Sequence, residues 1–498
     1  MKVNIANLSL HKWQFPSLFL GVILGGVVSF DPYLTNIIVK QVDVSVSRQN
    51  VFDLFPYELS ALVAVFLLTL FFGRRIFEGI ISHPDRSFQV FFLIGLQTIA
   101  LTSIGRIDFS EFLLLFYATV LIARAMVRQE KIIVTGFDLL NILFVMFVLL
   151  SSVVGGIVVF LSSSMTMVKF LLIGFLIVNT LKNMDDLKFF LKALVVITLV
   201  SALIAIVQEV IYLAFRVPVI GFVDKNNLKF LFEETVFGKI LRVPAFFGTY
   251  KPFTFFLNTS MMILLNYYLY NRPLKRKWMI FGALSFCVLF AALLLTLSND
   301  GFLAFLIGVC LSFLIWRPYL VFHFVAFAIA GVIIITGFGL WEDIGNTISA
   351  QIQWGEQRIR LQLAMEGISG FIHKHPWFGA GIQQAERYTG HYLGWPAHNS
   401  FIEGADEVGI FGLLAYLGLL FYTFLNLIRM NVMKQGKSEQ WLTRGLLLGF
   451  ITFMIVLQFH PFFAEKFAWL LMGTIQAVGL IAGRVGEASS GNSCDYQK

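Results

Sequence analysis

Charge is the scarcest feature of this 498-residue chain. Only 13% of its residues are Asp, Glu, Lys or Arg, whereas 58% are hydrophobic. A soluble globular domain carries about 25% charged residues. This low charged fraction excludes an ordinary soluble protein, so each charged residue is a candidate for a specific role in orientation or in a functional site.

Cysteine and metal-binding patterns are also scarce. The three cysteines, Cys287, Cys310 and Cys494, form no CxxC pair, so the sequence predicts neither a disulfide framework nor a zinc site. No HExxH motif occurs, and His373, His375 and His391 are too weak a pattern to predict a metal site. We therefore expect no metal and no cofactor.

Long polar stretches are rare because apolar runs of about 18 or more residues recur along the chain, and each can cross a bilayer as a helix. The sequence predicts an all-α polytopic membrane protein. It forms a single transmembrane domain over residues 1–498, with about 12–14 transmembrane helices. No cleavable signal is evident, so the first run is predicted to be retained. The predicted spans are centred on 15–30, 57–76, 89–105, 109–127, 138–161, 167–181, 189–214, 252–270, 278–297, 301–316, 319–339, 409–428, 445–460 and 467–483.

Lysine and arginine concentrate on alternate connections between these spans. If the N-terminus is cytoplasmic, the inner segments are basic, whereas the short outer connections hold only Arg106, Lys169 and Lys466. This asymmetry is typical of membrane orientation. It also explains the net charge of +8 without a nucleic-acid partner.

Three longer outer loops, 31–56, 215–251 and 340–408, and a cytoplasmic tail, 484–498, complete the predicted organisation. Within the third loop, residues 351–372 have apolar side chains at helical spacing and predict an amphipathic helix on the membrane surface. Those side chains are Ile352, Ile359, Leu363, Ile368 and Ile372. HPWFGAG (375–381) ends this helix with Pro and Gly.

Most polar side chains outside the basic connections fall at the predicted outer face, and Glu209 is the main exception within a span. Arg242 lies in the second loop, and Arg358 and Arg360 lie on the amphipathic helix. An arginine fork fits phosphate oxygens, so these residues are candidates to bind a lipid diphosphate. The alternative is that they are solvated or contact lipid headgroups.

The stretch PAHNSFIEGADEVGIFGLL (396–414) marks where the third loop re-enters the membrane. An imidazole such as His398 could accept the proton of an attacking sugar hydroxyl, because its ordinary pKa lies near neutrality. Asn399 is its neighbour. Glu403 and Glu407 follow at one and two helical turns, where they either orient the ring and bind the acceptor or cap the helix.

These residues resemble the O-antigen ligase and polymerase superfamily. The resemblance rests on an ordered pattern: Arg360 on a helix, HPWFGAG, His398-Asn399 and EVGIFG (407–412) before a span. It implies an inverting glycosyltransferase with a GT-C-like fold in the bacterial cytoplasmic membrane, with its active site on the extracytoplasmic face. The donor would be an undecaprenyl-diphosphate-linked oligosaccharide, with no nucleotide sugar or metal required.

The resemblance also implies residue roles. Arg360 would bind the diphosphate and His398 would activate the acceptor hydroxyl. The family pattern usually has a Ser-Arg pair near LLTLSNDGFLAF (294–305), but Asn299 stands where the arginine is expected. Arg242 or Arg358 would then supply the second cation.

Three functions compete. A polymerase would transfer the glycan to another lipid-linked glycan, with a chain-length regulator as a candidate partner; the length of the chain and its additional loop favour it. A ligase would transfer the glycan to lipid A-core. A transporter of lipid-linked glycans would need charges along a central cavity, which the apolar spans do not indicate. The departure at Asn299 also leaves an inactive scaffold open.

Overall fold

The structure is a computed structural model, and it describes the chain from Pro84 onward with gaps. The described residues are 84–97, 109–154, 156–215, 232–235, 238–245, 247, 250–270, 275–317, 319, 329, 336, 356–382, 397–432, 440–460 and 465–491. All of them lie in one compact unit, Ile80–Lys498. The predicted spans 15–30 and 57–76, most of 319–339 and the loop 31–56 lie outside the described residues.

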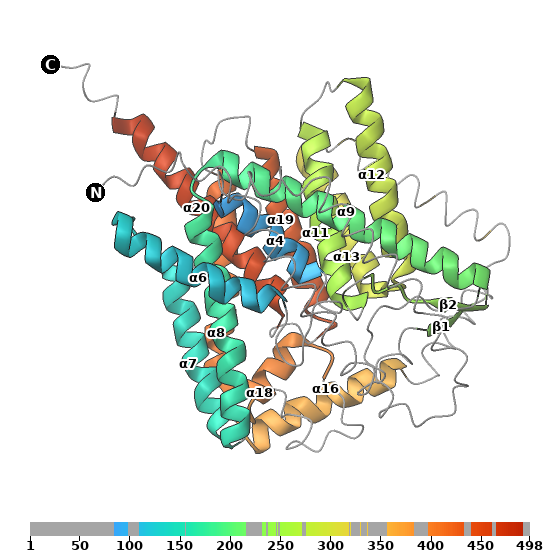
Figure 1. The fold of residues 1–498 in the computed structure, drawn as a ribbon. Helices are drawn as coiled ribbons and strands as arrows, with labels where there is room; N and C mark the ends of the chain where they lie inside the picture. Colours follow the sequence, from blue (N-terminus) through green and yellow to red (C-terminus); the bar gives the residue numbers. More distant parts are fainter. Residues whose placement is uncertain are drawn as a thin grey trace, which may run out of the picture. The chain divides into compact units, whose positions relative to one another are not determined.

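Helices form nearly all of the described secondary structure (Figure 1). The helices are α4 (Pro84–Gln97), α6 (Phe109–Arg128), α7 (Gly136–Val154), α8 (Ile157–Thr180), α9 (Met184–Phe215), α11 (Tyr250–Tyr270), α12 (Arg276–Leu295), α13 (Asn299–Trp316), α16 (Glu356–His373), α18 (Ser400–Val432), α19 (Gln440–Val456) and α20 (Lys466–Gly491). The predicted all-α membrane class is confirmed.

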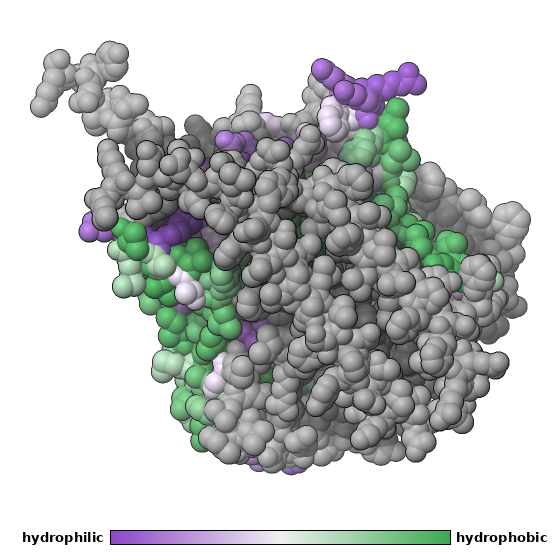
Figure 2. All heavy atoms as spheres, in the orientation of Figure 1, coloured by the Kyte–Doolittle hydropathy of each residue, from purple (hydrophilic) through white to green (hydrophobic). Residues whose placement is uncertain are grey.

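Six of the described helices are long and apolar enough to cross a membrane. On α9 the exposed apolar side chains Val196, Val200, Leu203, Val207 and Val210 follow one another at intervals of three or four residues. This spacing places them on a single face of the helix, where a soluble protein would carry polar residues. Figure 2 shows similar apolar surfaces on helices at the left and along α12. These faces are suited to contact with lipid.

The core between the helices is rich in aromatic side chains. Trp469 of α20 is fully buried and lies against Phe144 of α7 and Phe170 of α8. Elsewhere α11 and α19 approach closely because Gly445 and Gly449 present no side chain to α11. Small residues at such crossings allow tight helix packing without a hydrophobic driving force from water.

Several predicted boundaries are wrong in an informative way. The span expected at 138–161 is broken after Val154, and α8 begins at Ile157 rather than near 167. Gly156 has φ 90°, a conformation that ends helical geometry although the apolar run continues. Helix α18 begins at Ser400, within the stretch predicted as the third loop. Hydropathy identifies apolar runs, but it does not identify the residue at which a helix ends within such a run.

The second predicted loop, 215–251, contains a small hairpin that the sequence did not reveal. Strand β1 (Phe232–Thr235) pairs antiparallel with β2 (Gly238–Leu241), with Phe232 opposite Leu241. Within the predicted tail, α20 continues to Gly491. The hairpin leads directly into Arg242 and the start of α11.

Helix α16, predicted to be amphipathic, has its apolar side chains on two faces. Leu363 is buried, whereas Ile368 and Ile372 are exposed. Arg360, Leu363, Gly367 and Gly370 share the face that packs against α18, since they lie three or four residues apart. Leu361, Met365 and Ile368 leave a second apolar stripe exposed.

Candidate functional site

The turn after α16 and a break inside α18 are built as one unit. Helix α18 loses helical geometry at Gly409, where φ is 68° and ψ is −174°. The break frees the carbonyls of Asp406 and Glu407, which would otherwise accept bonds from the next helical turn.

The glycine turn 375–381 satisfies the freed backbone groups. Ala380 N donates to Asp406 O, and Gly381 N donates to Glu407 O, both at 2.9 Å. In return, Ile410 N donates to Pro376 O at 2.9 Å. The two motifs HPWFGAG and EVGIFG therefore exchange backbone hydrogen bonds, and we call this unit the glycine joint.

Glycine is required at two positions of the glycine joint. Gly379 and Gly409 both have positive φ, and a Cβ on either would overlap the backbone of the opposite segment. Glu407, buried at 3% exposure, contributes its carbonyl to the joint, where it also accepts a bond from Ser151 Oγ of α7. The joint thus fixes the C-terminal end of α16 against α18.

The segment His398–Ser400 is tied to the end of α19. Asn399 Oδ1 accepts bonds from Phe401 N at 2.9 Å and Ile402 N at 3.1 Å, so its side chain caps α18. Asn399 Nδ2 donates to Gln458 O at 3.0 Å. Ser400 N donates to Leu457 O at 2.9 Å. Asn399, predicted as an acceptor-supporting residue, therefore anchors the backbone beside His398.

His398 is held in an unusual backbone conformation, with φ 51°. Its ring is partly buried, and no described residue lies within hydrogen-bond reach of Nδ1. Burial lowers the pKa of His398 to about 3, assisted by the charges of Lys251, Arg360 and His460, while Asp300 opposes the shift. The imidazole is consequently neutral at physiological pH, and it is a weak base as long as the charges of Lys251 and Arg360 are uncompensated.

A buried Asp300–His460 pair lies in the same group and was missed by sequence reasoning. His460 Nε2 lies 2.5 Å from Asp300 Oδ2, with side-chain exposures of 2% and 9%. Ser298, the cap of α13, donates to Asp300 Oδ1 at 3.2 Å, and Ser400 Oγ donates to His460 O. Burial lowers the pKa of His460, although Asp300 counteracts it.

Three cations approach this group from different elements. Arg360 is partly buried on the α18-facing side of α16. Arg242, directly after β2, donates to Tyr250 OH at 3.0 Å and stacks its guanidinium over the Tyr250 ring. Lys251 in the first turn of α11 was not predicted. We call Arg242, Lys251 and Arg360 the cation cluster.

The remaining predicted residues have different outcomes. Arg358 lies in the first turn of α16, but its side chain is outside the described residues. Glu403 is partly buried in the first turn of α18, and its charge acts on Lys251. Glu403 therefore lies near the group, whereas Glu407 belongs to the glycine joint.

Glu465, just before α20, is another carboxyl that sequence reasoning missed. Burial raises its pKa to about 7, against the opposing charges of Lys466 and Lys251. Counting helices could have found it. Every second connection lies at the same end of a helical bundle, so the residues before α11, α13, α18 and α20 meet there. His460, whose charge acts on His398, and Glu465, on which the charge of Lys251 acts, are therefore at the His398 end.

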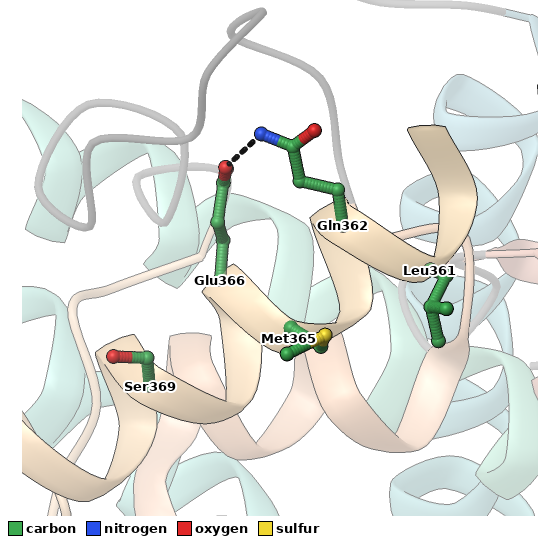
Figure 3. A pocket seen from close by; sticks show the side chains of 5 residues that line it. All are labelled: Leu361, Gln362, Met365, Glu366 and Ser369. Carbon is green, nitrogen blue, oxygen red and sulfur yellow. Dashed lines mark hydrogen bonds between the residues drawn. The ribbon is translucent and has the colours of Figure 1, made fainter. Parts of the chain in front are cut away.

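Two other features do not belong to this site. A shallow depression of about 470 Å³ lies on the exposed face of α16, lined by Leu361, Gln362, Met365, Glu366 and Ser369 (Figure 3). This face points away from Leu363, so it does not include the cation cluster. Within the described residues, no three His, Cys, Asp or Glu side chains come together to hold a metal ion.

Comparison with known families can now be set beside this geometry. Residues 261–417 match a protein family described as O-antigen ligase. Over this stretch the chain is similar to the O-antigen ligase family. The stretch contains α13, Arg360, the glycine joint and His398, and it ends inside α18. The match confirms the resemblance drawn from the sequence. The chain matches none of the curated proteins with which it was compared.

The O-antigen ligase family implies a multi-pass membrane enzyme of glycosyltransferase type that uses lipid-linked glycans. Arg242 and Lys251 precede the matched residues, and His460 and Glu465 follow them. The site therefore extends beyond the matched stretch into both flanking parts of the chain.

Proposed function

We propose that this protein is a polysaccharide polymerase. It transfers an undecaprenyl-diphosphate-linked glycan to a hydroxyl of another lipid-linked glycan, with inversion and without a metal. The observation that carries the proposal is the grouping of His398 with Lys251 and Arg360, whose charges act on its imidazole, within a stretch that matches the O-antigen ligase family.

The proposed reaction balances with these groups. The acceptor oxygen forms a bond to the anomeric carbon while the bond from that carbon to the diphosphate oxygen breaks. The electron pair leaves with the diphosphate, which Arg360 stabilises. His398 accepts the proton that the acceptor hydroxyl loses. No redox step or further co-reactant is needed.

Donor binding would also prepare the base. A diphosphate neutralises the cations whose charges lower the pKa of His398. Opposite charge near a histidine favours its protonated form, so the imidazole becomes more basic only when the donor is present. This coupling favours proton transfer when the donor is bound over proton transfer in its absence.

The membrane placement follows the charge pattern of the connections. With the basic connections in the cytoplasm, the ends of helices at His398 face the extracytoplasmic side of the bacterial inner membrane. A ligase acting on lipid A-core would use the same donor chemistry and is the second candidate. The described spans carry few charges, which disfavours a transporter of lipid-linked glycans.

The test is a transfer assay with purified protein in proteoliposomes. The only glycan supplied is a lipid-diphosphate-linked oligosaccharide, with chelator and without nucleotide. A ladder of longer glycans supports the polymerase. Product formed only after lipid A-core is added would replace the polymerase with the ligase, and no product with either acceptor would overturn both.

A further inference from the structure

One face of α11 packs against the beginning of α13. Lys251, Thr254 and Asn258 lie three and four residues apart and share this face. Asn258 Nδ2 donates to Gly301 O at 3.0 Å. Thr254 fills the space that a Cβ on Gly301 would need. The first turns of the two helices are therefore in direct contact.

Lys251 lies one turn before Thr254, toward the end of α13 that carries Asn299 and Asp300. It is partly buried, and it forms neither a hydrogen bond nor an ion pair within the described part of the chain. Asp300 is already engaged by His460 and Ser298. A partly buried ammonium normally requires an anion. Nothing described here supplies one by direct contact.

The surrounding charges show which kind of anion fits. Asp300 and Glu403 act on Lys251 with negative charge, and Arg360 and Arg242 act on it with positive charge. The cation cluster thus holds three positive charges against these two carboxylates and Glu465, whose pKa of about 7 leaves it only partly ionised near neutrality. A ligand with at least two negative charges would be attracted by the excess, and it could contact Lys251 and an arginine through separate phosphate groups.

We propose that Lys251 binds the second phosphate of the donor's diphosphate and replaces the cation that is absent at Asn299. This inference rests on the proposed function, because it assigns part of the same donor site. It makes Lys251 the residue that distinguishes a lipid diphosphate from a lipid monophosphate. Arg360 and Arg242 would contribute to binding both.

The test measures binding, so it does not depend on turnover. Undecaprenyl diphosphate and undecaprenyl monophosphate are titrated separately into protein in nanodiscs. The wild type should prefer the diphosphate. Lys251→Gln should weaken diphosphate binding by about 10- to 100-fold, the range expected for losing a hydrogen bond to a charged group. Binding of the monophosphate should change little.

Two variants separate charge from folding. Lys251→Arg should keep most of the preference, and Asn299→Arg combined with Lys251→Gln should restore part of it, because residue 299 is exposed beside Asp300. Lys275→Gln, an exposed lysine before α12, should have no effect. Thermal unfolding checks each fold.

The outcomes are distinct. An unchanged preference in folded Lys251→Gln, or a wild type that does not prefer the diphosphate, would overturn the role of Lys251. In the first case, transfer by the wild type would leave the proposed function standing. Failure of the wild type to transfer any glycan would sink the proposed function, whatever the binding of the free lipid.

Discussion

Two polar regions at opposite ends of α9 contain similar side chains but match their charges differently. At the start of α9 is an ion-pair network formed by Asp85, Arg124, Glu130 and Lys182. Arg124 lies 2.5 Å from Asp85 and 3.1 Å from Glu130, and Lys182 lies 3.4 Å from each carboxylate. Its two cations and two carboxylates are balanced within the protein.

Near the other end of α9, Gln208 donates to Ala245 O at 3.1 Å, just after Arg242 of the cation cluster. There three cations act with Asp300 and Glu403, and Asp300 already pairs with His460. The difference indicates two purposes. The ion-pair network stabilises the connections between helices, whereas the cation cluster is suited to an external anion.

The largest effect that would sharpen this comparison is expected at His398. His398→Asn keeps a residue that tolerates positive φ, but it removes the base. Transfer should fall by about 10²- to 10⁴-fold, the usual contribution of general base catalysis, with little change in thermal unfolding. A folded variant with wild-type rates would exclude His398 from the reaction.

The next effect concerns the glycine joint that supports the cation cluster. Gly409→Ala adds a Cβ against the backbone of Trp377 in a conformation that disfavours alanine. We expect a loss of about 2–4 kcal/mol in unfolding free energy. Gly418→Ala is the matched control, since it lies in α18 with nothing within 4 Å of a new Cβ. Equal unfolding free energies for the two variants would contradict the requirement for glycine at position 409 of the glycine joint.

A smaller effect is expected in the ion-pair network. Asp85→Asn leaves Arg124 and Lys182 with one carboxylate fewer. The pair is partly exposed, so the expected cost is about 1–2 kcal/mol, below that of a fully buried pair. Thermal unfolding should detect it, while donor KM per folded molecule stays unchanged. A change in donor KM without loss of stability would contradict the assignment of a purely structural role to the ion-pair network.

The smallest effect is a pH dependence of stability. His398 has a folded pKa of about 3, below the ordinary 6.5 of an unfolded histidine. The unfolded chain therefore binds the proton first, and stability present above pH 6.5 is lost as the pH falls toward 3.

Between pH 6.5 and 5 the expected loss from His398 is about 1.6 kcal/mol, with the same sign for His460. Unfolding free energies of the wild type and His398→Asn should be similar at neutral pH and separate as the pH falls, with the wild type losing more, if His398 carries this loss. Parallel curves across this pH range would show that it does not.

The sequence predicted some features of these regions and not others. Hydropathy identified the helical membrane class, and the family pattern identified Arg360, His398 and the two glycine motifs. The family pattern did not show that HPWFGAG and EVGIFG exchange backbone hydrogen bonds. Neither motif alone contains the hydrogen-bond partners that its backbone groups find in the other. Nor could apolar periodicity find the break at Gly156 or the hairpin before Arg242.

Lys251, Asp300 and His460 were missed for a single physical reason. Lys251 and Asp300 lie in the first turn of a helix, and His460 lies in the turn that follows α19, where a polar side chain looks like an ordinary cap. Only the convergence of four connections makes them one group. Asn299 drew attention to a missing cation, but the sequence offered Arg242 and Arg358 as replacements. The structure adds Lys251, which is distant from Asn299 along the chain.

The most direct measurement of the central claim counts products of a single transfer reaction. Purified protein receives only a lipid-diphosphate-linked oligosaccharide, and both the new glycosidic bonds and the released undecaprenyl diphosphate are quantified. The account predicts one released lipid diphosphate for each new bond in the wild type and in Asp85→Asn. In His398→Asn it predicts that both products form far more slowly. Bonds formed at an undiminished rate by His398→Asn, or lipid diphosphate released without bonds, would contradict it.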